Sequence, residues 1–181
     1  MAVPLAVQAF RQPQRMSAFS LAEWEMLLRQ AASANLTAAL YYLAEQHDQL
    51  DGIPARVREH LAWAQVQGER HRQGVRFEVR QIRLALAELD VPLILLKGAA
   101  YTMSGLPPAP GRLFSDIDIL VPKERLDDAE SALMLHGWAS THLDAYDQRY
   151  YREWLHDLPH MQHVMRKRVM DVHLGILPDT S

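Results

Sequence analysis

Three aspartates in the second half of the chain have a spacing that suits metal-assisted phosphate chemistry. Asp116 and Asp118 are two residues apart in the run Ser-Asp-Ile-Asp-Ile-Leu-Val that begins at Ser115. Because side chains alternate between the two faces of a strand, both carboxylates are predicted to project from one face. A third acid, Asp171, lies in the alternating run Val-Met-Asp-Val-His-Leu. Carboxylates this close repel each other unless a cation lies between them, so we predict a site for Mg²⁺ or Mn²⁺.

An Asp-x-Asp pair also arises by chance, and Ser115 and Asp116 are residue types that commonly end a loop before a strand. The order of the surrounding segments favours the metal site: an apolar strand, a Lys-Gly turn, a helix-compatible segment, the Asp-x-Asp strand, a helix, and a later strand bearing an acid. An α-helical interaction protein with an incidental Asp-x-Asp would leave this order unexplained.

The first 90 residues have helical patterns. Ser20 and Glu23 have the Ser-x-x-Glu form of a capping box, which predicts a helix start. Asn35 is expected to cap the next helix, and residues 1–16 are expected to be an irregular lead-in. The third helical segment is expected to be one long helix or two, bending near its two glycines. The expected helical segments are residues 20–32, 36–46 and 54–90.

The pattern then changes to short apolar runs that alternate with turns. The first of these runs, residues 91–96, is expected to be buried on both faces. Short helices are expected over 98–105 and from Pro122 to just before Gly137, and the prolines of 106–111 predict a rigid loop. The expected strands are residues 91–96, 114–121, 138–143, 160–165 and 169–174.

These patterns predict an α+β fold, in which an N-terminal α-helical block (1–90) precedes a small mixed β-sheet core with flanking helices (91–181). The formal net charge of −3 argues against a dedicated nucleic-acid binder, and the absence of cysteine excludes disulfides and thiol catalysis. No apolar run approaches the roughly 20 residues of a membrane helix, and no signal peptide is recognised, so a cytoplasmic protein without membrane contact is expected.

The segments Leu95-Leu96-Lys97-Gly98-Ala99, Arg112-x-x-Ser115-Asp116-Ile117-Asp118 and Met170-Asp171-Val172-His173 together resemble a known group. They are similar to the polymerase-β-type nucleotidyltransferase superfamily, and within it to the uncharacterised bacterial nucleotidyltransferase branch (NTP_transf_5). The resemblance covers about residues 91–177. It implies a transferase that moves a nucleoside monophosphate from an NTP, expected to be ATP, to an unidentified hydroxyl or phosphate acceptor.

The resemblance also implies roles for individual residues. Asp116 and Asp118 would be metal ligands, and Asp171 would complete a second metal position and act on the acceptor hydroxyl. Gly98 would be the first glycine of the triphosphate turn, whereas Ala99 stands where the superfamily usually has glycine or serine. The residues that we expect to contact the nucleotide are Lys97, Gly98, Ala99, Arg112 and Ser115.

Ala99 also leaves room for a second interpretation, a non-catalytic module of this fold that binds a nucleotide or a protein partner. Among acceptors, the slightly acidic charge argues most against a long nucleic acid. Members of the branch are generally longer, so we expect that further helical sequence belongs to the whole protein beyond Ser181.

Histidines and aromatic residues gather late in the chain. His160 and His173 are expected beside the acids, where they would tune the ligands or contact phosphate; ordinary hydrogen bonding on a half-buried sheet is the alternative. The spacing of the four late histidines matches no zinc signature; they are His156, His160, His163 and His173. Tyr150, Tyr151 and Trp154 would either stack on a base or pack between helix and sheet.

Overall fold

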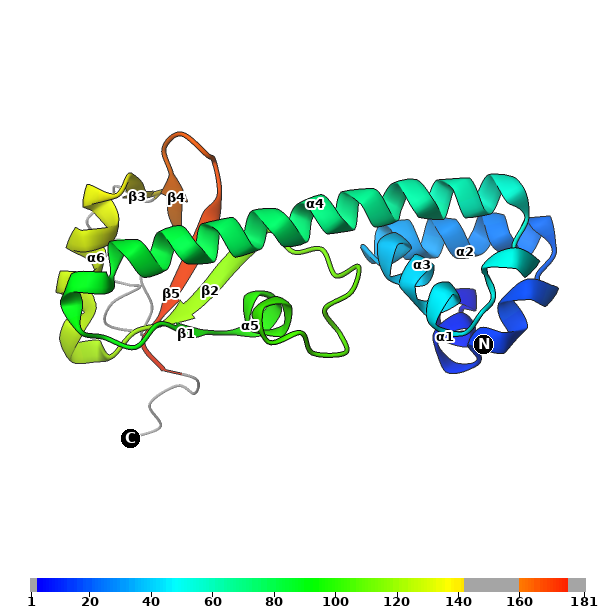
Figure 1. Ribbon diagram of the computed structural model, residues 1–181, viewed down its shortest axis with the longest axis horizontal. Helices are drawn as coiled ribbons and strands as arrows, with labels where there is room; N and C mark the ends of the chain where they lie inside the picture. Colours follow the sequence, from blue (N-terminus) through cyan, green and yellow to red (C-terminus); the bar gives the residue numbers. More distant parts are fainter. Residues whose placement is uncertain (1–2, 142–159, 176–181) are drawn as a thin grey trace. The chain divides into compact units, whose positions relative to one another are not determined.

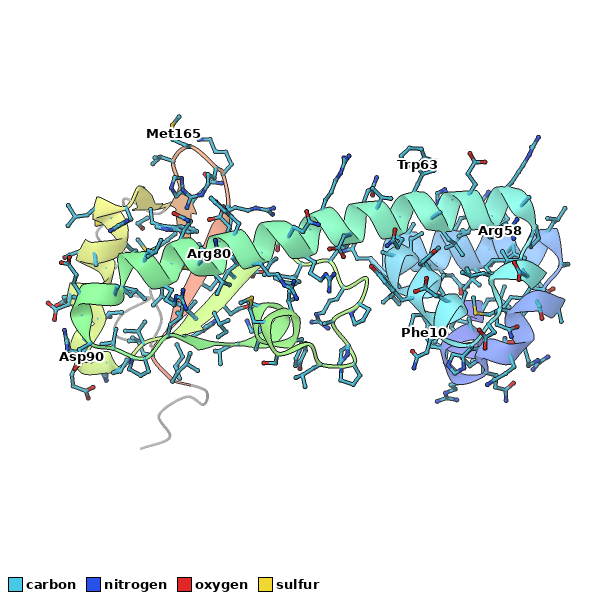
Figure 2. All side chains as sticks on the ribbon, viewed as in Figure 1. Phe10, Arg58, Trp63, Arg80, Asp90 and Met165 are labelled. Carbon is cyan, nitrogen blue, oxygen red and sulfur yellow. The ribbon has the colours of Figure 1, made fainter. Side chains whose placement is uncertain are left out.

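The structure is a computed structural model that describes residues 3–141 and 160–175 (Figure 1). Its chain forms two compact units, one made of residues 1–73 and 106–113 and the other of 74–105 and 114–181. The fold is α+β, with helices and a small mixed sheet, which confirms the predicted class. Within the described ranges, none of the helices combines the length and the apolar character needed to cross a membrane.

The first unit is helical. Its elements are α1 (Leu5–Arg11), the 3₁₀ helix η1 (Pro13–Ala18), α2 (Leu21–Ser33), α3 (Thr37–Gln46), the 3₁₀ helix η2 (Leu50–Gly52) and the first part of α4 (Ala55–Ala85). Apolar positions on one side of α2, among them Trp24 and Leu27, are fully buried with Met16, Leu40 and Leu61. Burying such side chains is the main stabilising contribution to a helical block of this size.

The predicted capping box is confirmed, because the Ser20 side chain accepts from the Glu23 amide while the Glu23 carboxylate accepts from the Ser20 amide. The prediction for Asn35 is wrong. Asn35 adopts a left-handed φ of 56° after α2, and α3 follows Leu36 without a side-chain cap. An irregular lead-in over 1–16 is also wrong, since α1 and η1 form where Ala9 and Met16 pack into the core.

The long helix α4 is uninterrupted through both of its glycines and contributes to both units. It ends at Ala85, earlier than the expected residue 90. The 3₁₀ helix η3 (Ala87–Leu89) follows, and Asp90 then takes a left-handed φ of 50°. A non-glycine residue in this conformation cannot continue the helix, and the chain turns towards the sheet.

The proline-rich loop over residues 106–113 packs against the helical unit. Gly111 has a φ of 72°, and a Cβ atom there would lie 2.4 Å from the Ala39 amide nitrogen and 2.5 Å from the Ala38 carbonyl carbon. Only glycine permits this backbone approach and this φ. The loop that precedes the Asp-x-Asp strand is therefore held on α3.

The second unit contains a five-stranded sheet of order β1-β2-β5-β4-β3. Its strands are β1 (Ile94–Leu95), β2 (Asp116–Leu120), β3 (Trp138–Ser140), β4 (Met161–His163) and β5 (Val169–His173). β2 and β5 are parallel and the other neighbours are antiparallel, so the sheet is mixed as predicted. β1 is an edge strand in which Ile94 is 42% exposed, so the expected burial of 91–96 on both faces is wrong.

One face of this sheet forms the core of the second unit. Ile117 and Ile119 of β2 and Met170 and Val172 of β5 are buried together with residues of α4 and of α6 (Leu126–Leu135). The helix α6 follows the 3₁₀ helix η4 (Lys123–Arg125) and ends before Gly137, whose φ of 86° is the predicted helix stop. Alternation along β2 and β5 places the intervening polar residues on the opposite face.

Candidate functional site

The acids of β2 and β5 share the sheet face opposite the core. In the parallel pairing Asp118 lies level with Asp171, Asp116 with Val169, and Leu120 with His173. Since paired residues of neighbouring strands point to the same side, Asp116, Asp118, Asp171 and His173 share this face. We call these four residues the acid face. The local reason is the alternating sequence of both strands, which directs Ile117, Ile119, Met170 and Val172 to the core and the intervening polar side chains to the other face.

Asp118 is the centre of the acid face. It is only 3% exposed, and its Oδ1 atom lies 2.5 Å from the Lys97 Nζ atom and 2.9 Å from the His173 Nε2 atom. Both groups can donate a hydrogen bond to the carboxylate. A buried carboxylate requires such partners, because leaving its charge unpaired away from water is strongly unfavourable.

The other two acids have partners of their own. The His160 Nδ1 atom and the Asp171 Oδ1 atom are hydrogen-bonded, and Ser115 donates from its hydroxyl to the Asp116 Oδ1 atom over 3.2 Å. His160 precedes β4, which pairs with β5. The structure therefore brings His160 and His173 to the acids, where the sequence analysis expected them, and it also places the Ser115 hydroxyl beside Asp116.

Lys97 begins α5 (Lys97–Ser104) in an unusual backbone conformation, with a φ of 44°. The preceding amide of Leu96 donates to the Asp118 carbonyl oxygen over 2.9 Å, so the start of α5 is attached to β2 at Asp118. The hydrogen bond to Asp118 raises the pKa of the Lys97 ammonium, and the charges of Asp118, Asp116 and Asp171 raise it further. All three carboxylates thus act on one ammonium group.

The turn into α5 is tightly packed. Gly98 is buried, and a Cβ atom there would lie 2.7 Å from the Phe114 ring. Ala99 is also buried and belongs to the core, so its methyl group packs against apolar side chains. The first amides of a helix lack partners within the helix, so any contact of this turn with an anion would use backbone N–H groups.

Arg112 belongs to the first unit. It lines a cavity of about 780 Å³ together with Phe10, Asn35, Tyr42 and the prolines of the 106–113 loop. The remaining expected residues, Lys97, Gly98, Ala99 and Ser115, belong to the second unit with the acids.

The donor set of the acid face fits a divalent cation. Ligand atoms of Asp118, Asp171 and His173 all lie within 4.8 Å of one another. Carboxylate oxygens suit Mg²⁺ or Mn²⁺, and His173 is placed to orient Asp118 through its hydrogen bond.

A comparison with protein families adds a decisive observation. The family described as uncharacterised nucleotidyltransferase matches residues 20–181, which includes the acids, the Lys-Gly turn and most of the helical unit. The chain belongs to this nucleotidyltransferase family. The resemblance inferred from its motifs is therefore confirmed at the level of the family. No curated protein and no solved structure matched the chain.

One feature of this nucleotidyltransferase, a buried ion pair, was not predicted from the sequence. Glu78 of α4 is 3% exposed, and Arg166 of the β4–β5 turn donates from Nε to both of its carboxylate oxygens, over 2.8 and 3.0 Å. The guanidinium also lies over the Phe77 and Trp138 rings. The sequence does contain a signal for this pair, because Glu78 interrupts an otherwise apolar stripe of the helix. A buried acid in such a stripe requires a cationic partner.

The Glu78–Arg166 pair attaches to α4 the turn between β4 and β5, and β5 is the strand that carries Asp171. The aromatic residues Tyr150, Tyr151 and Trp154, the expected strand end at 142–143 and His156 lie outside the described residues.

Proposed function

We propose that this nucleotidyltransferase moves a nucleoside monophosphate from an NTP, which we expect to be ATP, to a hydroxyl or phosphate acceptor in a Mg²⁺- or Mn²⁺-dependent reaction. The observation that most supports the proposal is the register of β2 and β5. It sets the nearly buried Asp118 level with Asp171 on a face that also carries Asp116 and the Lys97 ammonium.

In this reaction the acceptor oxygen forms a bond to the α-phosphorus of the nucleotide. The bond from that phosphorus to the oxygen bridging to the β-phosphate breaks, and pyrophosphate leaves. The acceptor oxygen loses its proton during the attack when the acceptor is a hydroxyl. Asp171 is suited to accept that proton, because its carboxylate is held in place by His160.

Asp116, Asp118 and Asp171 would hold the divalent ions. When bound, the ions supply positive charge to the phosphate oxygens in the transition state. His173 holds the Asp118 carboxylate in position, and Lys97 carries a permanent positive charge beside it. The first amides of α5, at Gly98 and Ala99, would donate to phosphate oxygens.

The only observation that bears on the class of acceptor is the net charge of the protein. The formal net charge of −3 favours a small molecule, a carbohydrate or a protein side chain over a long nucleic acid. A cytoplasmic location stays a prediction of the sequence.

Calorimetric titration with Mg²⁺ and a non-hydrolysable ATP analogue tests the proposal. We expect saturable binding by the wild type and a loss of at least about 100-fold in the Asp116→Asn/Asp118→Asn variant, since even outer partners of metal ligands contribute 10–100-fold. Asp128→Asn, an exposed acid of α6 paired with Arg125, is the matched control and should bind normally. Equal binding by the double variant, with an unchanged circular dichroism spectrum, would refute the ligand roles.

The non-catalytic module is favoured by one observation, the buried Ala99, which offers no hydroxyl to a triphosphate. Turnover separates the two functions. Release of pyrophosphate from NTP in the presence of a mixture of small hydroxyl compounds supports the enzyme, whereas metal-dependent nucleotide binding without any release supports the module.

A further inference from the structure

The position of the Lys97 ammonium has a consequence for how a cation enters the acid face. Its Nζ atom lies 2.5 Å from the Asp118 Oδ1 atom, and Asp116 and Asp171 also act on it electrostatically. Asp118 and Asp171 are the two carboxylates whose ligand atoms lie close enough to share a cation. The protein therefore already holds one positive charge among the carboxylates that would receive another.

We propose that Lys97 is a tethered cation that neutralises the acid face before metal binds, and that an entering divalent ion displaces its ammonium from Asp118. This inference rests on the proposed function, because it takes the acid face to be the metal site. It assigns Lys97 a role as a competitor of the metal, in addition to the phosphate contact expected from the sequence.

The two ends of this ion pair differ in their freedom. The Asp118 side chain is 4% exposed and also bonded by His173, whereas the Lys97 side chain is 60% exposed. Asp118 is fixed in the sheet, but the four-carbon stem of Lys97 reaches it from the solvent side. The ammonium can therefore leave without any change in the sheet, and the carboxylate stays in place.

The backbone at Lys97 supports a specific role for its side chain. A left-handed φ of 44° is unfavourable for a residue with a Cβ atom. Glycine would relieve this strain, and the next residue, Gly98, is a glycine without a positive φ. The surrounding structure therefore holds Lys97 in a strained conformation from which its side chain reaches Asp118.

Displacement of the Lys97 ammonium would couple the binding of metal to the binding of nucleotide. An ammonium released from Asp118 stays attached at the start of α5, beside the amides proposed to hold phosphate oxygens. A bound triphosphate would attract the released ammonium, so metal would bind more tightly when nucleotide is present. Linkage requires that nucleotide then also binds more tightly when metal is present, by the same factor.

The test is the affinity for Mn²⁺ alone, measured by the paramagnetic resonance of free Mn²⁺, in the wild type and in Lys97→Met. Methionine keeps a long side chain but removes the charge. We expect Lys97→Met to bind Mn²⁺ about fivefold more tightly, the factor for an ion pair of this exposure. Saturating Mn²⁺ should also raise the melting temperature of Lys97→Met more than that of the wild type.

Lys167→Met is the matched control. Lys167 also has a left-handed backbone, with a φ of 58°, but lies in the β4–β5 turn. The Lys167→Met substitution removes the same charge and should change the Mn²⁺ affinity less than twofold. Lys97→Arg, which keeps the charge, should retain the weaker binding of the wild type.

A second titration uses a non-hydrolysable ATP analogue with and without Mn²⁺. The increase in nucleotide affinity caused by Mn²⁺ should be about fivefold smaller in Lys97→Met than in the wild type. Equal or weaker Mn²⁺ binding by Lys97→Met would overturn the inference and leave the proposed metal site standing. Absence of Mn²⁺ binding in every form would overturn both.

Discussion

Replacement of Gly111 by alanine should destabilise the protein far more than the same change at Gly105, although both residues have a left-handed φ. The φ values are 72° and 62°. At Gly105 nothing lies within 4 Å of an added Cβ atom, so only the backbone conformation is penalised, by about 1–2 kcal/mol.

At Gly111 the added atom would also lie 2.4 Å from the Ala39 amide nitrogen and 2.7 Å from the Ala38 carbonyl oxygen. Because these are backbone atoms of α3, the loop must move away as a whole. Overpacking of this kind costs about 1–3 kcal/mol in addition to the conformational penalty, which gives about 2–5 kcal/mol in total.

Urea denaturation followed by far-ultraviolet circular dichroism measures the difference. With a slope of about 2 kcal/mol per molar urea, a loss of 1 kcal/mol lowers the midpoint by about 0.5 M and a loss of 3 kcal/mol by about 1.5 M. Equal midpoints for Gly105→Ala and Gly111→Ala would show that the loop does not pack on α3 as described.

Three further predictions concern caps and buried charges. Ser20→Ala should lower the free energy of unfolding by about 1 kcal/mol in urea denaturation, because the reciprocal hydrogen bonds with Glu23 are lost; an unchanged midpoint would contradict the capping role. Arg166→Met should cost about 2–3 kcal/mol in the same assay, since it leaves the Glu78 carboxylate buried without its cation, and a neutral result would refute that pairing. Burial, aided by the nearby Arg166 charge, lowers the pKa of His163 below its ordinary value, so the unfolded chain binds its proton more readily than the folded protein does. Stability should therefore fall as the pH decreases below about 6.5, and His163→Gln should reduce that dependence; identical pH profiles would be inconsistent with a buried neutral imidazole.

The strands that carry the acids were predictable because their alternation is regular. Asp116 and Asp118 were expected on one face and Asp171 on another strand nearby, and the register of β2 with β5 places all three on the same face. The expectation that His160 and His173 lie beside the acids rested on the same alternation. Period-two patterns specify a face directly, since a shift of one residue would expose every buried side chain.

Other features depend on contacts between distant residues, which no local pattern contains. The helix at Leu5–Arg11 is short and is stabilised by packing, so its sequence alone read as irregular. The prolines of 106–111 predicted a loop but gave no sign that α3 is its partner. Likewise Asn35 suits a helix start and a left-handed helix end equally well, and the observed φ of 56° selects the second.

The central place of β5 determines when the candidate site can come into existence during synthesis. Among the described strands β5 is the latest in the sequence, yet it lies between β2 and β4 in the sheet. Until its residues leave the ribosome, β2 and β4 cannot be joined, and Asp118 has neither Asp171 nor His173 beside it. The helical unit can fold early from local contacts, whereas the sheet must wait for a long-range parallel pairing, which is intrinsically slow. A nascent chain of this protein would thus present the unpaired edge of β2 from the synthesis of Leu120 until that of β5, and during this time we expect its need for chaperones to be greatest.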